Sequence, residues 1–429
     1  MVWSKAARLS IVRRWPAVAV VAVAAASLVL AGIVRARRRP TAPVSATMRT
    51  QPAGSGRTSE RGLWSADGGP RVLPLTAEFD RQAALLLGAH ELVTAHPQVF
   101  VSIAAAVHRN VRLVCLVAGS SEIALGRRLL DQARLPPTAI QFISLPMDTL
   151  WIRDHGPLFV RRADNSVVVV DLEYGAWALR ADRRRDEEVP KVFAKLLGLP
   201  VVDVPLKLSG GNLLSNGEGV CVTTTAAAVA LRAAFTAGQR ATVSREETQA
   251  VMQVLGNSLG FHTWVCLDTL KGEPTGDVDM FVTLLAADVA VVGRLDPAAD
   301  PVNAAILDDA AAKLAGAATS RGPMRVHRIP MPPPRKGKWR SYTNVVYANG
   351  VLLVPTFSDE PPGPQREALA LYSRLLPGWR IVGIKSDGLE RAEGLLHCLT
   401  RNVPWFVPPP KQPGASRAVS GGSQRVPPA

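Results

Sequence analysis

The stretch Glu393-Gly-Leu-Leu-His-Cys-Leu-Thr400 near the C-terminus holds Cys398 in a polar, glycine-flanked setting. The other three cysteines, Cys115, Cys221 and Cys266, lie in apolar runs typical of strands, where a free cysteine is usually a small core residue. No Cys-x-x-Cys spacing occurs, which argues against a structural zinc site or a disulfide framework. Cys398 is therefore the candidate nucleophile of this chain.

Two acidic segments lie far upstream of this cysteine, Trp151-Ile-Arg-Asp-His-Gly-Pro157 and Thr275-Gly-Asp-Val-Asp-Met-Phe281. A guanidinium group is planar, permanently charged and a poor electrophile. Paired carboxylates can hold such a cation bidentately and keep its carbon in line with an attacking sulfur. The combination predicts a cysteine-dependent enzyme that acts on guanidinium groups.

The net charge of +15 does not indicate nucleic-acid binding, because the excess lies at the two ends of the chain. Residues 1–62 contain eleven Lys and Arg and one acid, and residues 400–429 contain four Lys and Arg and no acid. The rest is nearly neutral, whereas a nucleic-acid-binding body needs a basic face on the fold itself. We therefore expect no nucleic-acid partner.

An uncharged run from Ala17 to Val34 is flanked by basic residues on both sides. Its 18 residues are just long enough to cross a bilayer, for which roughly 20 are typical. Residues 1–34 are predicted to be a signal anchor or a cleaved signal peptide, and the sequence leaves both open. The soluble part is expected to be anchored to the membrane through residues 17–34, or exported, with its orientation undecided.

The composition divides the rest of the chain into three parts. Residues 35–64 are rich in Arg, Pro, Ser, Thr and Gly, and residues 408–429 are similar, so both are predicted to be disordered. Residues 65–407 form the predicted folded unit, in which short apolar strands alternate with helices in an α/β pattern. The predicted strands and helices are Asn110–Ala118, Glu122–Ala133, Thr138–Leu145, Ser166–Leu172, Asp186–Leu197, Val220–Thr224, Glu246–Leu255, Phe281–Leu285, Val289–Val292, a hairpin around Asn349-Gly350 and a helix from Pro364.

Six segments in order along the chain resemble the agmatine deiminase and bacterial-type peptidylarginine deiminase family of the guanidino-group modifying superfamily. They are Thr76-Ala-Glu-Phe79, Trp151 to Pro157, Gly210-Gly-Asn212 with Gly217-Glu-Gly219, Thr275 to Phe281, Ser341-Tyr-Thr-Asn344 and His397-Cys-Leu-Thr400. The resemblance covers about the whole folded unit. It implies a pentein-like, five-bladed pseudo-symmetric α/β propeller with its site at the hub.

The resemblance also implies roles for individual residues. Cys398 would attack the guanidinium carbon, Asp154 and Asp279 would clamp the nitrogens, and ammonia would leave before water releases a ureido product. Trp151, Arg153, Gly211 and Asn212 are further expected substrate contacts. No metal or organic cofactor is implied. The substrate is a guanidino small molecule such as agmatine or an arginine-containing peptide, and neither the choice between them nor the oligomeric state follows from the sequence.

The chain departs from the family pattern at Asp277, where related enzymes carry a histidine that protonates the leaving ammonia. The neighbouring carboxylates of Asp277 and Asp279 can raise one another's pKa and so partly restore an acid. His155 and His397 are the other candidates to replace the histidine. Ser209 also stands where the family usually has an acid. The alternative function is a membrane-tethered protein that binds guanidinium groups without turnover.

Overall fold

The computed structural model describes residues 69–174, 183–227, 245–392 and 394–407. The predicted anchor or signal segment at 1–34, the linker at 35–64 and the tail at 408–429 all lie outside these ranges. Within the described ranges, no helix combines the length and the apolar character that crossing a bilayer requires. The membrane segment therefore stays a prediction from the sequence.

Five sheets of the same design make up the body of the protein. In each sheet a first strand pairs antiparallel with a second, and the second pairs parallel with a third. The sheets are β18-β1-β2-β3 (Thr400–Pro404, Gln82–Gly88, Arg112–Val117, Ile140–Ser144), β4-β5-β6 (Leu158–Arg161, Val167–Glu173, Val201–Lys207), β7-β8-β9 (Leu214–Ser215, Val220–Thr224, Thr263–Leu267), β10-β11-β14 (Val282–Ala286, Val289–Arg294, Arg325–Pro330) and β15-β16-β17 (Val346–Tyr347, Val351–Thr356, Arg380–Lys385).

Helices join the parallel strands, because a parallel pair needs a crossover that a tight turn cannot supply. The crossover helices are α3 (Pro97–Val107) and α4 (Ser120–Gln132) in the first unit, then α6 (Arg184–Leu197), α8 (Arg245–Leu259), α9 (Pro301–Ala315) and α10 (Pro362–Leu375) in units two to five. A short hairpin, β12 (Ala318–Thr319) with β13 (Gly322–Pro323), is inserted in the fourth unit.

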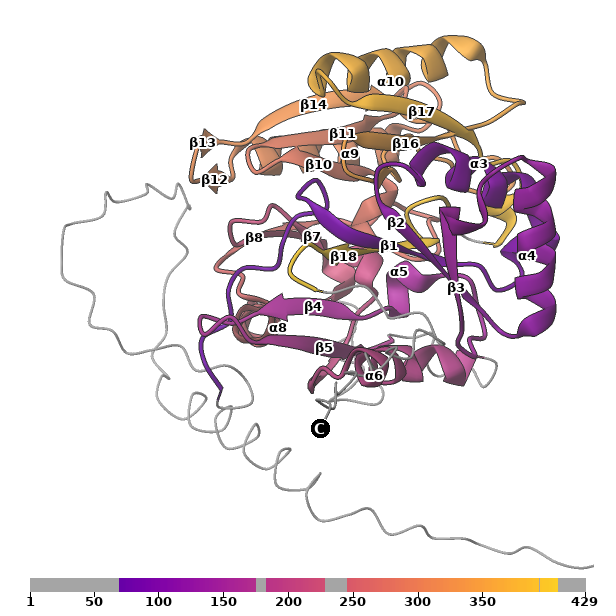
Figure 1. Cartoon of the computed structure of the whole chain (residues 1–429). Helices are drawn as coiled ribbons and strands as arrows, with labels where there is room; N and C mark the ends of the chain where they lie inside the picture. Colours follow the sequence, from indigo (N-terminus) through magenta and orange to yellow (C-terminus); the bar gives the residue numbers. More distant parts are fainter. Residues whose placement is uncertain (1–68, 175–182, 228–244, 393, 408–429) are drawn as a thin grey trace, which may run out of the picture. The chain divides into compact units, whose positions relative to one another are not determined.

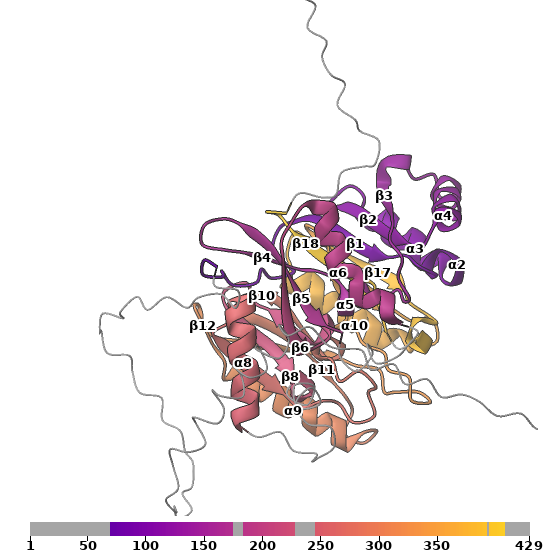
Figure 2. The same cartoon turned by 90° about the horizontal axis from the view of Figure 1, so that it is seen from below.

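The helices also connect each sheet with the sheet before it in the sequence. Figure 1 shows α10, from the fifth unit, lying over β14 of the fourth, and α10 contacts both β14 and its own β17. Likewise α9 contacts β9, α8 contacts β6, and α3 of the first unit contacts β16 and β17 of the fifth. Figure 2 shows α6 and α9 beside β5 and β11 of their own units. The contacts between units therefore run in a cycle from the fifth back to the first.

Strand β1 is buried on both faces, which explains its continuously apolar sequence. Leu85 and Leu87 belong to one hydrophobic cluster, together with residues of α3, whereas Ala84 and Leu86 belong to another, together with Phe193 of α6. Successive side chains of a strand point to opposite faces. Both faces of this sheet are covered, so neither set of positions can be polar.

The C-terminal strand β18 completes the first sheet. It pairs antiparallel with β1, with Thr400 opposite Leu87 and Arg401 opposite Leu86. The segment immediately before β18 contains Cys398. The last strand of the fold therefore places the cysteine beside the N-terminal part of the domain.

The predicted α/β fold is confirmed, and most predicted elements are found with small shifts at their ends. Val220–Thr224 has the predicted bounds, and Asn349 and Gly350 form the turn between β15 and β16 with φ of 47° and 86°. Helix α10 begins at Pro362, not at Pro364. Cys266 lies on a strand as predicted, but it is only half-buried. Among the described residues the sheets are separate and none closes on itself. The structure shows five repeated units, and their arrangement as a propeller stays a prediction.

The side chain of Asn349 forms hydrogen bonds that join the fifth unit to the first. Its Oδ1 accepts from the backbone N–H of Gln82 at 2.8 Å, and its Nδ2 donates to the carbonyls of Gln82 and Asn110 at 2.9 and 3.1 Å. Asn349→Ala should lower the free energy of unfolding by about 2–3 kcal/mol, since it removes these bonds and places alanine at positive φ.

Asn349→Gly is the matched control, because glycine accepts the turn but makes none of the side-chain bonds. We expect it to cost about 1 kcal/mol less than the alanine variant in equilibrium denaturation. Equal stability of wild type and Asn349→Gly would show that the bonds to Gln82 and Asn110 contribute nothing.

Candidate active site

The connections between consecutive units carry the predicted site residues. Asp154 lies on α5 (Ile152–His155), between the first and second sheets, and Gly211 on η4 (Gly210–Asn212), between the second and third. Asp277 and Asp279 lie in and next to η5 (Val278–Met280), between the third and fourth sheets. Cys398 follows the fifth sheet. Helix α5 contacts η4 and β18, and η4 contacts η5, so the repeated fold brings these connections together.

The three aspartates converge on Gly211. A Cβ atom built on this glycine would lie 2.9 Å from Asp154 Oδ1, 2.9 Å from Asp277 Oδ2 and 3.1 Å from Asp279 Oδ2. Three carboxyl groups thus surround one point, and any larger residue at position 211 would fill the space between them. We call Asp154, Asp277 and Asp279 the aspartate cluster. Gly211 was expected to contact the substrate, and in the structure it lies next to all three carboxyl groups of this cluster.

Cys398 adjoins the aspartate cluster. Its Sγ lies 3.8 Å from Asp279 Oδ2, and the residue is 7% exposed. Burial raises the pKa of the thiol well above its ordinary value, and the charges of Asp279 and Asp154 raise it further. Each of these causes disfavours the anion, so the sulfur is a neutral thiol at pH 7 in the absence of a cation.

Asn344 holds the cysteine segment, which contains His397 and Cys398, in place. Its Nδ2 donates to Cys398 Sγ at 3.6 Å, and its Oδ1 accepts from the backbone N–H of His397 at 2.8 Å. The residue is fully buried and comes from the connection between the fourth and fifth sheets. Asn344 belongs to one of the segments that resemble the family, and the sequence alone assigned it no role.

His397 lies between two carboxylates. Its Nδ1 is 2.7 Å from Asp279 Oδ2, and its Nε2 is 2.7 Å from Glu78 Oε2. Burial and Arg153 lower the pKa of His397, but Glu78 and Asp279 outweigh them and the net shift is upward. Both ring nitrogens are therefore occupied by carboxylates, so the imidazole positions Asp279 and is not directed at the sulfur.

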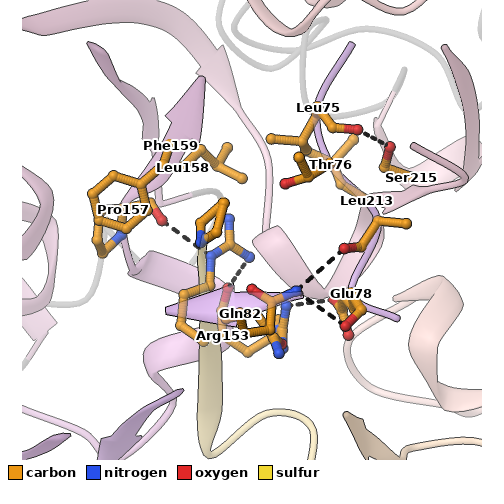
Figure 3. A pocket seen from close by; sticks show the side chains of 14 residues that line it. Leu75, Thr76, Glu78, Gln82, Arg153, Pro157, Leu158, Phe159, Leu213 and Ser215 are labelled. Atoms are coloured by element: carbon orange, nitrogen blue, oxygen red, sulfur yellow. Dashed lines mark hydrogen bonds and ion pairs between the residues drawn. The ribbon is translucent and has the colours of Figure 1, made fainter. Parts of the chain in front are cut away.

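Arg153 pairs with Glu78, the carboxylate on the side of His397 that faces away from Asp279. Its Nη1 pairs with Glu78 Oε1 at 2.6 Å, and its backbone N–H donates to the carbonyl of Cys398 at 3.0 Å. Glu78 and Arg153 face one another with Gln82 in the pocket drawn in Figure 3. Arg153 was expected to contact substrate; its contacts in the structure are those of a residue that positions the cysteine segment.

Glu78 is a site residue that the sequence analysis did not assign. Burial acts to raise its pKa, but Arg153 and His397 outweigh burial and lower the pKa to about 2. The carboxylate therefore stays charged and holds His397 and Arg153 together. It lies in the segment Thr76-Ala-Glu-Phe79, whose membership in the family pattern was the only available signal.

Asn212 positions the loop of Asp277 and Asp279. Its Oδ1 accepts from the backbone N–H groups of Thr224 and Val278, at 3.0 and 3.2 Å, and its Nδ2 donates to Thr224 Oγ1 at 3.0 Å. The residue is buried, at 1% exposure. Asn212, expected as a substrate contact, connects η4, β8 and η5.

Trp151 and His155 flank Asp154 in the sequence but occupy different surroundings. The ring of Trp151 is packed against Gly394, whose built Cβ would lie 2.4 Å from it, and is therefore next to the cysteine segment. His155 lies 3.6 Å from Asp186 and stacks edge-on against Tyr174. Burial lowers its pKa to about 4, so it is a neutral core residue and not a proton donor of the aspartate cluster.

A second cavity opens beside the aspartate cluster. Its lining includes Met280, which follows Asp279 directly, and Gly394, which precedes Cys398 by four residues; Glu273 and Trp339 line it as well.

No group of His, Cys, Asp and Glu with an arrangement suited to a metal ion occurs in the part of the chain that the structure describes. Three carboxyl groups around one point, next to a thiol, can hold an organic cation.

Comparison with known proteins agrees with this geometry. The family model for Porphyromonas-type peptidyl-arginine deiminase matches residues 76–404. The agmatine deiminase of Stutzerimonas stutzeri is 26% identical over 339 residues, covering 71% of this chain and 86% of the relative. The agmatine deiminase of Pseudomonas putida KT2440 is 29% identical over 325 residues, covering 68% and 82%.

Solved structures give the same result. A Porphyromonas gingivalis protein to which arginine deiminase activity is ascribed has a TM-score of 0.65 at 25% identity, covering 78% of this chain and 99% of that one. The agmatine deiminase of Enterococcus faecalis has a TM-score of 0.63 at 20% identity, covering 77% and 95%, and shows the likeness of fold. From the match over residues 76–404, together with the convergence of its site residues, the chain belongs to the Porphyromonas-type peptidyl-arginine deiminase family.

Proposed function

We propose that this protein is a hydrolase that converts a guanidinium group to a ureido group and ammonia, with Cys398 as the nucleophile. The observation that carries the proposal is the convergence of Asp154, Asp277 and Asp279 on Gly211 beside the buried Cys398 thiol. Buried carboxyl groups are costly unless a cation or a proton compensates them. A guanidinium group supplies that cation and presents its carbon to the sulfur.

Asp154 and Asp279 bind the guanidinium nitrogens in this mechanism. Both approach the same point from different connections, which suits a planar cation with donors on several edges. Asp279 is held by His397, and Asp154 by Ser209, so neither carboxyl is free to rotate away. Fixed carboxylates align the carbon with the sulfur without a further loss of entropy at the moment of reaction.

Binding of the cation also activates the thiol. The pKa of Cys398 is raised by burial and by the charges of Asp279 and Asp154, and the positive charge of a bound guanidinium offsets the effect of the two aspartates and favours the thiolate. The thiol proton then leaves to solvent, and the thiolate attacks the guanidinium carbon. The reactive thiolate of Cys398 therefore forms only when the substrate is bound.

The substrate class that we propose is a small guanidine such as agmatine. Cys398 and Asp279 are 7% and 2% exposed, so the reacting group must enter a nearly closed space. The curated relatives reported above are named agmatine deiminases and are matched over 86% and 82% of their length. No observation favours the alternative in which the site binds guanidinium groups without turnover.

The test is an assay of ureido product and ammonia with agmatine, free arginine and an arginine-containing peptide. Agmatine should give both products in equal amounts, and Cys398→Ala should give neither. Product from the peptide but not from agmatine would replace the proposed substrate class. Equal turnover by wild type and Cys398→Ala would refute the assigned nucleophile.

The raised thiol pKa predicts a specific pattern of alkylation. Iodoacetamide should modify Cys398 slowly at pH 7 and faster as the pH rises above 9, because only the thiolate reacts. Asp279→Asn should increase the rate at pH 8 several-fold, since it removes a like charge 3.8 Å from the sulfur. Peptide mapping gives an internal control, because Cys115 and Cys221 are fully buried and should stay unmodified.

Gly211→Ala should lower activity about a hundredfold while the protein remains folded. Its Cβ would enter the space between the three carboxyl groups, at 2.9 to 3.1 Å from each, and displacement of binding groups by about 1 Å costs about a hundredfold in rate. Gly363→Ala is the matched control, because a Cβ there meets nothing within 4 Å. Activity of Gly211→Ala within twofold of the control would show that this space is not occupied in the reaction.

We also propose, from the sequence alone, that residues 17–34 direct the protein to or across a membrane. Full-length protein should then sediment with membranes or be exported, and deletion of residues 1–34 should leave it in the cytosolic fraction. Fractionation of cells expressing both forms measures this, and an identical distribution of the two would remove the proposal.

A further inference from the structure

A single hydroxyl group lies between two of the three aspartates. Ser209 Oγ is 3.0 Å from Asp154 Oδ1 and 2.7 Å from Asp277 Oδ2. The backbone N–H of Gly211 also donates to it, at 3.1 Å. Three polar neighbours therefore share one hydroxyl, which has one hydrogen to donate and two lone pairs to accept.

A count of hydrogens favours a proton on one of these two aspartates. The N–H of Gly211 occupies one lone pair of Ser209, so the hydroxyl can donate to one aspartate and accept from the other. An ionised carboxylate can only accept. With both ionised, one pair of oxygens would oppose lone pair to lone pair inside the protein, without a hydrogen between them. A proton on Asp154 or Asp277, donated to Ser209, satisfies all three contacts.

Asp277 is the better holder of that proton. Burial, then the charges of Asp154 and Asp279, and then that of Glu273 raise its pKa well above its ordinary value, against the opposing bond from Ser209. Burial and Asp279 raise the pKa of Asp154 to about 7, but Arg153 and His397 act in the other direction. The main influences on the pKa of Asp277 include no cation. The proton consequently resides on Asp277.

The charge balance of the surrounding network agrees with this assignment. Both nitrogens of His397 lie 2.7 Å from carboxylate oxygens, which both act as acceptors only if the ring carries two hydrogens. Burial lowers the pKa of Arg401 to about 9, which still leaves a cation at pH 7. Arg153, Arg401 and His397 act on Glu78 and Asp154, and His397 contacts Asp279. Asp277 instead has the further carboxyl group of Glu273 near it, so a charge on Asp277 would add to the negative side of this network.

We propose that Asp277 is a neutral carboxylic acid in the resting protein and that it protonates the amine that leaves in the first step. Ser209 is a positioning residue, whose hydroxyl accepts from Asp277 and donates to Asp154, so that the proton is held on one side and the clamping charge on the other. This inference rests on the proposed function and assigns the proton donor within the same site.

The step balances as follows. The thiolate of Cys398 bonds to the guanidinium carbon and gives a neutral tetrahedral adduct. One amino group takes the proton of Asp277, its C–N bond breaks with the electron pair, and ammonia leaves a thiouronium cation beside the new Asp277 carboxylate. Water then returns a proton to Asp277 as its oxygen bonds to carbon. The C–S bond breaks with its electron pair returning to sulfur, and the ureido product loses its extra proton to solvent.

Infrared difference spectroscopy tests the protonation without requiring turnover. The spectrum of wild type minus Asp277→Asn at pH 7 should show the C=O band of a carboxylic acid. Asp279→Asn is the matched control, because it introduces the same amide but should remove only a carboxylate band. A carboxylate band in the Asp277 difference would overturn the proposal, whether or not the protein is a deiminase.

Leaving-group kinetics test the catalytic role. Asp277→Asn should lower agmatine turnover by about 10²–10⁴-fold, the usual contribution of a general acid. An agmatine analogue with a terminal methylthio group in place of one amino group expels methanethiolate, which needs no proton. The variant should release one equivalent of methanethiol from it and stop as the thiouronium adduct on Cys398, detected by mass spectrometry.

Asp277→Glu is the conservative variant and should recover part of the agmatine turnover, because it restores a carboxylic acid. If Asp277→Asn instead slows both substrates by the same factor and forms no adduct, Asp277 acts in binding and the proposal fails. If wild-type protein turns over neither substrate, the proposed function fails, while the infrared experiment still decides whether Asp277 carries a proton.

Discussion

Burial of charge is the constraint on which this structure depends. Asp277 and Asp279 are buried and Glu78 and Asp154 are half-buried beside them, in surroundings where unpaired carboxylates would destabilise the fold. Arg153, Arg401 and His397 compensate three negative charges, and a proton on Asp277 removes the fourth. The thiol of Cys398 stays neutral for the same reason. A cation that enters the site can be accepted only if a proton leaves, which couples substrate binding to formation of the thiolate.

The repeated fold makes this concentration of charge possible. Each of the five units combines an antiparallel pairing with at least one parallel pairing, and the connection from one unit to the next returns to the same region of the domain. Asp154, Gly211, Asp279, Asn344 and Cys398 each come from a different connection. Hydrophobic packing of the helices and sheets supplies the stability, which leaves the connections free to carry polar residues. Asn212 and Asn344 then fix these connections with hydrogen bonds to backbone groups and to the sulfur.

The two departures from the family pattern are neighbours in space. The resemblance implies an acid at the position of Ser209 and a histidine at that of Asp277, and in this chain the side chains of these two residues are 2.7 Å apart. A carboxyl group is thus present at one of the two positions in this chain, and a hydroxyl links it to Asp154. The exchange keeps an ionisable group beside the clamp. His155, which is adjacent to Asp154 in the sequence, is separated from this chemistry by its packing against Tyr174 and Asp186.

Local patterns explain which parts of the fold were predictable. Strand Val220–Thr224 and the Asn349-Gly350 hairpin follow from apolar runs and turn residues, which act over a few positions. The half-buried position of Cys266 depends on what covers β9, and its own strand does not contain that information. The same limit applies to Arg153, since its partner Glu78 lies 75 positions away.

The sequence by itself determined the kind of chemistry: a cysteine, three aspartates and their order along the chain, in segments shared with a family. Only the tertiary structure decided what each group does. It placed His397 between two carboxylates, turned Arg153 toward Glu78, and set Ser209 between Asp154 and Asp277. Protonation depends on burial and on the neighbouring charges, and these come from connections that lie far apart in the sequence and meet only in the folded chain.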